Sequence, residues 1–240
     1  MSENLRIYDL TVNYIKNPLG LDSQPRFSWK YASKNRGSKQ IEYKLTIRSD
    51  NEEYVKQETS EESLHITCPD LKLMPRTRYS WEVEIKDNKG DSAVSKQAWF
   101  ETGKLDEEWA ANWITADFIR KPDMAMEAPY FRKSFGLDKE PVDAKLYICG
   151  LGYCRAFVNG EKCGDDELST AFTRYDSTAL YMTYDVTGSV SKGGNILAAV
   201  LGNGWYNCFA QDPWNTRQAT WRSAPKLIAE LHVKFEDGTS

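Results

Sequence analysis

Residues 79–85 read Tyr-Ser-Trp-Glu-Val-Glu-Ile, so that aromatic or aliphatic side chains alternate with polar ones. Successive side chains of a β-strand point to opposite faces of its sheet, and this alternation therefore predicts a strand with one buried and one solvated face. Trp81 belongs to the apolar series, as does Trp29 in the similar stretch at residues 26–31. Both tryptophans are predicted to anchor a hydrophobic core.

The same alternation recurs up to about Gly103, and turn residues interrupt it at short intervals. Further strands are predicted at residues 5–8, 43–48 and 98–102, with turns at residues 17–20, 34–37 and 87–90. Short strands with frequent turns are typical of a two-sheet sandwich of the immunoglobulin or fibronectin type III kind. Residues 1–104 are predicted to form such a sandwich, and because they hold no constellation of acids, bases and nucleophiles, a structural spacer is the simplest role for them.

A second β-sandwich is predicted at residues 130–240, after a linker at residues 105–129. Its strands are expected at residues 131–135, 143–150, 153–158, 180–186, 196–201 and 226–235. Asn159-Gly160 directly follows one of them, and this dipeptide is the strongest local signal for a type I′ hairpin. Residues 236–240 carry a turn signal with no strand after it. The all-β chain is therefore expected to be cut before the last strands of its second sandwich and to be part of something longer.

Composition excludes several classes of partner. The 240 residues are 40% hydrophobic and 28% charged, with a net charge of -4. The chain therefore lacks the excess of basic residues that is typical of nucleic-acid-binding proteins. No apolar run approaches the ~18 residues of a membrane span, and the N-terminus lacks the plan of a signal peptide. A cytoplasmic location and export with removal of a leader both stay open. Five widely spaced cysteines and two histidines argue against a disulfide framework and against a zinc site.

A long aromatic loop follows the predicted strand at residues 196–201. Aromatic faces accept the C–H face of a sugar, while amides and charged groups between them satisfy its hydroxyls. The alternative is that the rings fill a core beneath the loop and that the glycines beside Asn203 form a turn with positive φ. The candidate sugar-binding residues are Asn203, Trp205, Tyr206, Trp214 and Trp221.

Four carboxylates lie in loops next to the predicted hairpin: Asp165, Asp166, Glu167 and Asp176. Calcium takes six to eight oxygen ligands, so these residues are candidate calcium ligands. Their spacing does not reproduce an EF-hand loop, and solvated turn acids are the alternative. No motif in the chain requires a cofactor, and calcium is the one ion that these residues suggest.

Several motifs, taken together, resemble the N-terminal region of bacterial α-L-rhamnosidases. They occur in the order of that family and cover nearly the whole chain. In the first half they are residues 17–22 (NPLGLD), 25–29 (PRFSW), 77–81 (TRYSW), 100–103 (FETG) and 109–114 (WAANWI). In the second half they are residues 157–160 (FVNG), 181–187 (YMTYDVT) and 201–206 (LGNGWY).

The resemblance implies a modular glycoside hydrolase that cleaves terminal α-L-rhamnosides with inversion. Its parts would be a fibronectin-like sandwich, a jelly-roll sandwich similar to carbohydrate-binding modules, and an α/α barrel that carries the catalytic acid and base. This chain offers no such barrel, so it is expected to be the non-catalytic part, with no catalytic residue of its own. The implied partners are an L-rhamnose-containing carbohydrate and the barrel of the same polypeptide. A free-standing lectin-like module and a purely structural spacer are the alternatives.

Two further points follow from the resemblance. Some modules of this kind bind rhamnose through a calcium ion, although no short motif here fixes its ligands. Residues 168–173, Leu-Ser-Thr-Ala-Phe-Thr, depart from the family pattern, in which Pro-Gly-Trp follows the serine. Phe172 keeps an aromatic side chain in this segment.

Overall fold

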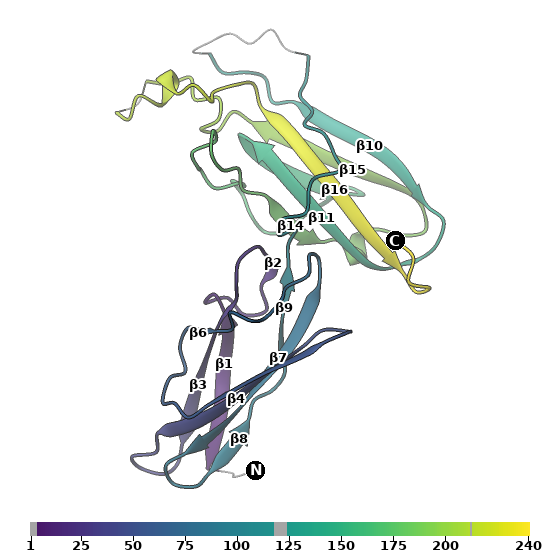
Figure 1. Cartoon of the computed structure of the whole chain (residues 1–240). Coiled ribbons are helices and arrows are strands. Elements are labelled where there is room, and N and C mark those ends of the chain that lie inside the picture. The colour runs from purple at the N-terminus through teal and green to yellow at the C-terminus, as the bar shows by residue number, and fades with distance from the viewer. Residues whose placement is uncertain (1–3, 118–123, 212) are drawn as a thin grey trace. The chain divides into compact units, whose positions relative to one another are not determined.

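The computed structural model describes residues 4–117, 124–211 and 213–240, with only the backbone of Arg217. It divides into two compact units, Met1–Glu108 and Trp109–Ser240, and each is built from β-strands (Figure 1). Residues 109–117 thus pack with the second unit. No helix in the described ranges has the length and apolarity needed to cross a membrane. The prediction of an all-β chain with two sandwiches is confirmed.

The first unit consists of two facing sheets. The smaller has the order β1 (Leu5–Val12), β3 (Arg26–Ser33), β6 (Ile66–Thr67). The larger has the order β2 (Leu19–Leu21), β9 (Ala98–Thr102), β7 (Arg78–Asp87), β4 (Gln40–Arg48), β5 (Glu53–Glu58), with β8 (Ser92–Val94) also paired to β7. All pairs are antiparallel except β2 with β9. The strands found at β1, β3, β4, β7 and β9 confirm those predicted from alternation.

Trp29 and Trp81 lie in the core of the first unit, as predicted, and each is 1% exposed. The rings of Phe27 and Trp81 meet edge to face with centroids 4.9 Å apart. The indole N–H of Trp29 donates a 2.9 Å hydrogen bond to Oε1 of the fully buried Gln40. This bond satisfies a polar group that burial would otherwise leave without a partner.

The second unit also has two sheets. One has the order β10 (Tyr130–Leu137), β15 (Gly193–Gly202), β12 (Tyr153–Val158), β13 (Glu161–Lys162). The other has the order β14 (Met182–Asp185), β11 (Pro141–Leu151), β16 (Lys226–Phe235). Short 3-10 turns occur at Thr187–Ser189 and Thr216–Gln218. Asn159 and Gly160, with φ of 50° and 89°, form the predicted tight turn between β12 and β13.

The sheet β14-β11-β16 is covered on both faces. Leu146 and Ile148 of β11 pack into the core between the two sheets, while Cys149 and Leu151 pack into a separate cluster with Tyr206. Since successive residues of a strand point to opposite faces, the two clusters lie on opposite sides of this sheet. Residues 144–151 are accordingly all buried, which explains why β11 contains a continuous apolar run instead of an alternation.

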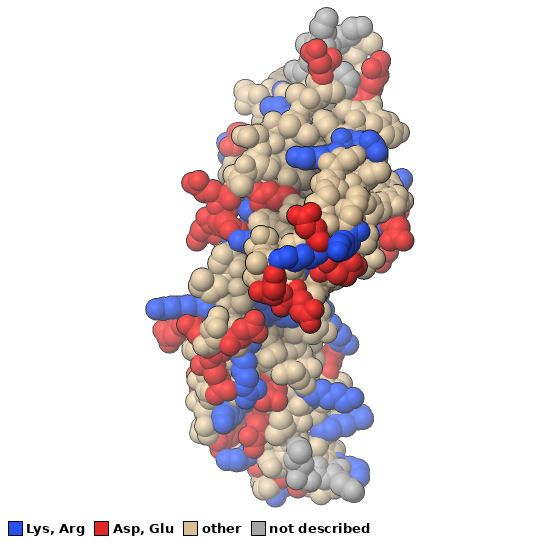
Figure 2. Space-filling view, turned by 90° about the vertical axis from the view of Figure 1, so that its right-hand side faces the viewer, with Lys and Arg blue, Asp and Glu red and all other residues tan. Residues whose placement is uncertain are grey.

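Charged side chains do not segregate by sign on the visible surface. Figure 2 shows acidic and basic side chains interspersed over the face in view. This pattern agrees with the small net charge of -4.

Candidate functional site

Two loops of the second unit bring aromatic rings together. One joins β13 to β14, and the other, at residues 203–225, joins β15 to β16. Six rings form a continuous series of contacts that we call the aromatic rim: Phe172, Tyr175, Trp205, Tyr206, Trp214 and Trp221. Four of the five candidate sugar-binding residues therefore belong to a single cluster, and Asn203 shortly precedes two of them in the chain.

The outer part of the rim faces solvent. Trp214 is 76% exposed and Phe172 is 53% exposed. Trp205 is half-buried, and its ring centroid is 5.8 Å from that of Phe172 and 6.2 Å from that of Trp214. Contiguous exposed apolar patches often mark interaction surfaces, so these three rings form the accessible part of the candidate site.

The inner part of the rim is packed. Tyr206 is 6% exposed, and its ring lies nearly parallel to that of Trp221 with centroids 6.4 Å apart. Tyr175 meets both rings edge on, at 5.3 Å from Tyr206 and 5.0 Å from Trp221. Burial raises the pKa of the Tyr175 hydroxyl to about 12. These three rings anchor the loops that carry the outer three.

The amide of Asn203 joins chain segments to each other. Its Oδ1 accepts hydrogen bonds from the Met126 N–H at 2.9 Å and from Nδ2 of Asn207 at 2.7 Å. Its Nδ2 donates to the carbonyl oxygen of Met126 at 2.8 Å. The side chain thus fastens the segment that precedes β10 to the segment that follows β15, and a role in sugar recognition stays a prediction.

The four candidate calcium ligands do not converge. Glu167 forms ion pairs with Arg155 and with Lys162, whose Nζ lies 2.8 Å from Oε1. The Lys162 hydrogen bond and the nearby Arg155 hold the pKa of Glu167 below its usual value. Both cations compete with a metal ion for this carboxylate.

Asp176 and Asp166 are also engaged with neighbours. Arg174 contacts both oxygens of Asp176, at 2.8 and 3.1 Å, and holds its pKa below the usual value. Oδ2 of Asp166 accepts a 3.2 Å hydrogen bond from the Tyr184 hydroxyl. Across the described ranges no group of three or more His, Cys, Asp or Glu side chains is arranged to hold a metal ion. The predicted calcium set, Asp165 included, is therefore not assembled in this fold.

Sequence reasoning missed Tyr175 and did not place Phe172 among the site residues. Phe172 contacts Tyr175, Trp205 and Trp221, so it links the inner and outer rings. Two aromatic residues three apart in a loop rich in polar residues were the available signal.

Two family descriptions match the chain. The one named Rha78A-like, N-terminal immunoglobulin domain matches residues 7–106. The one named α-L-rhamnosidase N-terminal domain matches residues 139–240. Each match falls within one of the two compact units.

Curated relatives carry the same family name. The chain is 32% identical to an α-L-rhamnosidase of Formosa agariphila, over 95% of this chain and 27% of that protein. It is 28% identical to an α-L-rhamnosidase of Alteromonas sp., over 93% of this chain and 26% of that protein. The chain thus spans about a quarter of the length of these relatives.

Solved structures agree. The α-L-rhamnosidase of Dictyoglumus thermophilum superposes with a TM-score of 0.85 at 31% identity, over 98% of this chain and 28% of that one. The enzyme of Aspergillus terreus gives 0.87 at 25% identity, again over 98% and 28%. A Streptomyces avermitilis α-L-rhamnosidase complexed with L-rhamnose has the same fold, with a TM-score of 0.83 at 21% identity, over 98% of this chain and 40% of that one. The two units of the chain therefore match the N-terminal, non-catalytic region of α-L-rhamnosidases.

Proposed function

We propose that the second unit binds an L-rhamnose-containing carbohydrate at the outer part of the aromatic rim. The observation that carries the proposal is the solvent-facing arrangement of Phe172, Trp205 and Trp214. A pyranose presents C–H groups on its faces, and such groups pack favourably on aromatic rings. Packed inner rings keep the outer rings in place, so little ordering of the loops would oppose binding.

The choice of sugar rests on the relatives. Those described above are named α-L-rhamnosidases, and the Streptomyces avermitilis structure contains L-rhamnose. We further propose that these domains serve a longer polypeptide that hydrolyses α-L-rhamnosides with a catalytic barrel. In that polypeptide the rim would hold or border the substrate while other residues break the bond.

Calorimetric titration of the chain with L-rhamnose, with and without calcium, tests the binding proposal. Wild-type protein should release heat, and Trp214→Ala should weaken the affinity by about tenfold, which equals about 1.4 kcal/mol. Tyr14→Ala is the matched control because Tyr14 is 71% exposed but lies in the first unit. If the wild-type protein releases no heat, or if the two variants bind L-rhamnose with equal affinity, binding at the rim is contradicted.

A structural role is the second candidate, and the packing of Tyr206 and the bonds of Asn203 favour it. In that case Tyr206→Ala should lower the free energy of unfolding by about 3 kcal/mol. The titration with L-rhamnose should then show no heat at all.

Turnover of a chromogenic α-L-rhamnoside tests the role in hydrolysis separately. The 240-residue chain should give no product, whereas the complete polypeptide encoded by its gene should give product. A complete polypeptide that is inactive on rhamnosides would contradict the assignment to a hydrolase.

A further inference from the structure

The sheet β10-β15-β12-β13 has one face that points away from the core of the second unit. Alternate residues of its strands, such as Phe135, Ala156 and Leu201, pack into the core between the two sheets. Because successive side chains of a strand point to opposite faces, the residues between them point outward. We call the following residues the outer face: Tyr130, Arg132 and Ser134 of β10, Ile196, Ala198 and Val200 of β15, Tyr153, Arg155 and Phe157 of β12, and Lys162 of β13.

The apolar residues of the outer face lie outside the buried clusters of this unit. Phe157, Ile196 and Val200 are half-buried, and within the described ranges they belong to neither cluster. Tyr130, the first residue of β10, is 83% exposed. Contiguous exposed apolar patches often mark interaction surfaces. The outer face is therefore a candidate binding surface in addition to the aromatic rim.

The strand register places long side chains on both sides of short ones. Val200 of β15 lies opposite Tyr130 of β10 and opposite Arg155 of β12. Two residues away on the same strands, Ala198 lies opposite Arg132. Short aliphatic side chains on the middle strand thus lie between rings and guanidinium groups on the outer two. Since a strand rises about 3.4 Å per residue, residues 196–202 extend this arrangement over about 20 Å, which suits an oligosaccharide better than a single sugar.

The charged side chains on the outer face are all basic. They are Arg132, Arg155 and Lys162, and they come from three different strands. Glu161 is the one acidic residue of these four strands. It is paired with Val158, whose side chain packs into the core, so Glu161 lies on the opposite face. The outer face is therefore complementary to a ligand with negative charges.

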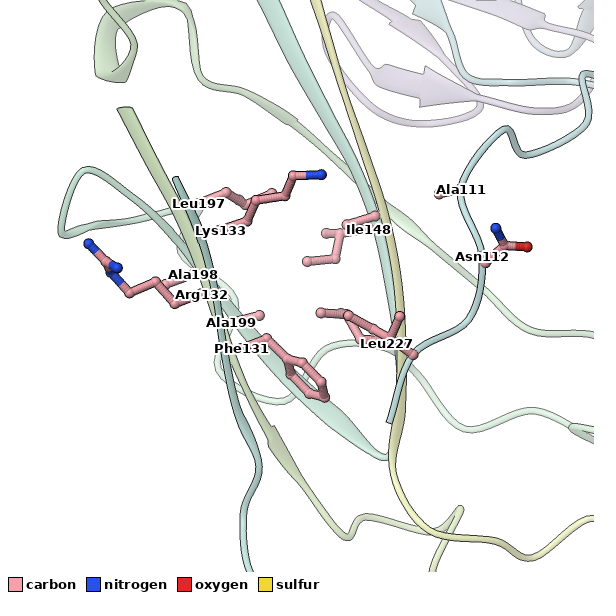
Figure 3. Close-up of a pocket in the computed structure, with 12 residues that line it drawn as sticks. Ala111, Asn112, Phe131, Arg132, Lys133, Ile148, Leu197, Ala198, Ala199 and Leu227 are labelled. Atoms are coloured by element: carbon pink, nitrogen blue, oxygen red, sulfur yellow. The ribbon is translucent and has the colours of Figure 1, made fainter. Parts of the chain in front are cut away.

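Arg132 has its guanidinium group available for such a ligand. Among the residues that the structure describes, it forms no hydrogen bond or ion pair, whereas Arg155 and Lys162 share the carboxylate of Glu167. Figure 3 shows Arg132 directed away from the pocket between the two sheets, while Lys133 extends into that pocket. A guanidinium group matches the planar geometry of a carboxylate and can bind both of its oxygens. A carboxylate on the ligand would thus pair with the cation that the fold leaves unneutralised.

We propose that the outer face binds an acidic polysaccharide, whose sugar rings carry carboxylates. The polysaccharide lies along β15, packs the C–H faces of its sugars on Tyr130 and directs its carboxylates to Arg132 and Arg155. A carbohydrate fits better than an acidic peptide because the outer face reaches the aromatic rim. Tyr153 is paired with Gly202, the last residue of β15 before the loop that carries most of the rim. The choice of a carbohydrate rests on the function proposed for the rim, whereas the preference for an anion rests on the charges of the outer face.

Calorimetric titration of the 240-residue chain with polygalacturonate tests the proposal. The wild-type protein should bind polygalacturonate but not neutral dextran, and about 0.5 M NaCl should weaken the binding at least tenfold, because salt screens exposed charges. Arg132→Glu should weaken it by about tenfold at low salt, because a carboxylate at this position repels those of the ligand. Arg36→Glu is the matched control, since it makes the same charge change at an exposed turn of the first unit. If the wild type does not bind, or if both variants bind equally well, the proposal is overturned.

A second comparison tests whether the ligand is a carbohydrate. Tyr130→Ala should weaken binding of polygalacturonate by about fivefold, because it removes the ring on which a sugar packs. Tyr14→Ala, at a 71% exposed position of the first unit, should leave this binding unchanged. Poly-L-glutamate has carboxylates but no sugar rings, so it should bind more weakly than polygalacturonate. Equally tight binding of the two polymers would show general attraction of anions and would overturn the proposal.

Titration with L-rhamnose separates the outer face from the aromatic rim. Arg132→Glu should leave the affinity for L-rhamnose unchanged, and Trp214→Ala should leave the affinity for polygalacturonate unchanged. A chain that binds polygalacturonate but no L-rhamnose would contradict the function proposed for the rim alone. A chain that binds L-rhamnose but no polygalacturonate would contradict the outer-face site alone. If Trp214→Ala weakens both ligands equally, polygalacturonate binds at the rim and the outer-face site is overturned.

Discussion

Gly152 lies so close to Gly202 that a Cβ atom at position 152 would stand 2.0 Å from the carbonyl oxygen of Gly202. Gly152 also has a φ of 96°, a conformation that other residues rarely adopt. The contact brings the turn between β11 and β12 against the end of β15, directly before the loop that carries the aromatic rim. Two independent reasons therefore require glycine at position 152.

Replacement of Gly152 by alanine should destabilise the second unit by about 3 kcal/mol or more, because backbone atoms would have to move apart. Gly160→Ala is the matched control, since Gly160 has a φ of 89° but no atom within 4 Å of an added Cβ. That variant should lose only about 1 kcal/mol, the cost of the left-handed conformation. Urea denaturation of both variants measures the difference, and equal losses would contradict the steric argument.

Gln40→Leu should lower the free energy of unfolding of the first unit by about 2 kcal/mol, because it leaves buried polar groups unpaired. Gln40 accepts from the Trp29 indole and donates to the carbonyl oxygens of Ser60 and Glu62. Gln57→Leu removes an exposed amide and should change stability by less than about 0.5 kcal/mol. Thermal unfolding of the two variants measures these losses. A Gln40→Leu protein as stable as the wild type would refute the prediction.

Asp185 should make stability depend on pH in the acidic range. Burial raises the pKa of its carboxyl, but hydrogen bonds from Thr187 and the charge of Lys145, whose Nζ lies 3.2 Å from Oδ2, outweigh this and leave it below 3.8. A carboxyl group whose pKa is lower in the folded protein than in the unfolded chain stabilises the fold. This stabilisation is complete above the pKa of the unfolded chain and is lost as the pH falls through the pKa of the folded protein. The stability difference between wild type and Asp185→Asn should therefore be constant from about pH 7 to 5 and shrink below about pH 4. Urea titrations over this range check it; a difference that grows on acidification would have the wrong sign.

The cysteines should be unreactive in the folded protein. All five are buried thiols, and burial raises the pKa of Cys149 and of Cys154 to about 12. Since the thiolate is the reactive form, Ellman's reagent at pH 8 should label the native chain slowly. After unfolding in urea it should label all five at once. Rapid labelling of any thiol before unfolding would contradict the described burial.

Most of the long strands could be predicted because they have one buried face and hence an alternating sequence. Strand β11 is buried on both faces, and its continuous apolar run is typical of such a covered strand. Strand β5, with the sequence Glu-Tyr-Val-Lys-Gln-Glu, was missed because it pairs only with β4 and most of its side chains are exposed. The two- and three-residue strands β2, β6 and β8 are too short to show a period. Their place is set by pairing with distant segments, which local patterns do not record.

The aromatic loop could be recognised from composition, but which of its rings are buried and which are exposed could not. Tyr206 and Trp214 look equivalent in the sequence, yet one is 6% and the other 76% exposed. That difference arises from contacts with Tyr175 in another loop. Likewise, the carboxylate of Glu167 suggested a metal ligand until the fold placed Arg155 and Lys162 beside it.

The contrast between buried and exposed indoles gives the protein optical reporters of its own. Trp29 and Trp81 of the first unit are shielded from water and should emit at short wavelength, whereas the largely exposed Trp214 should emit further to the red. Replacing Trp205, Trp214 and Trp221 by phenylalanine would remove much of the fluorescence of the second unit. Melting of the first unit could then be followed in the variant, and that of the second unit from the difference between wild type and variant, without an attached dye.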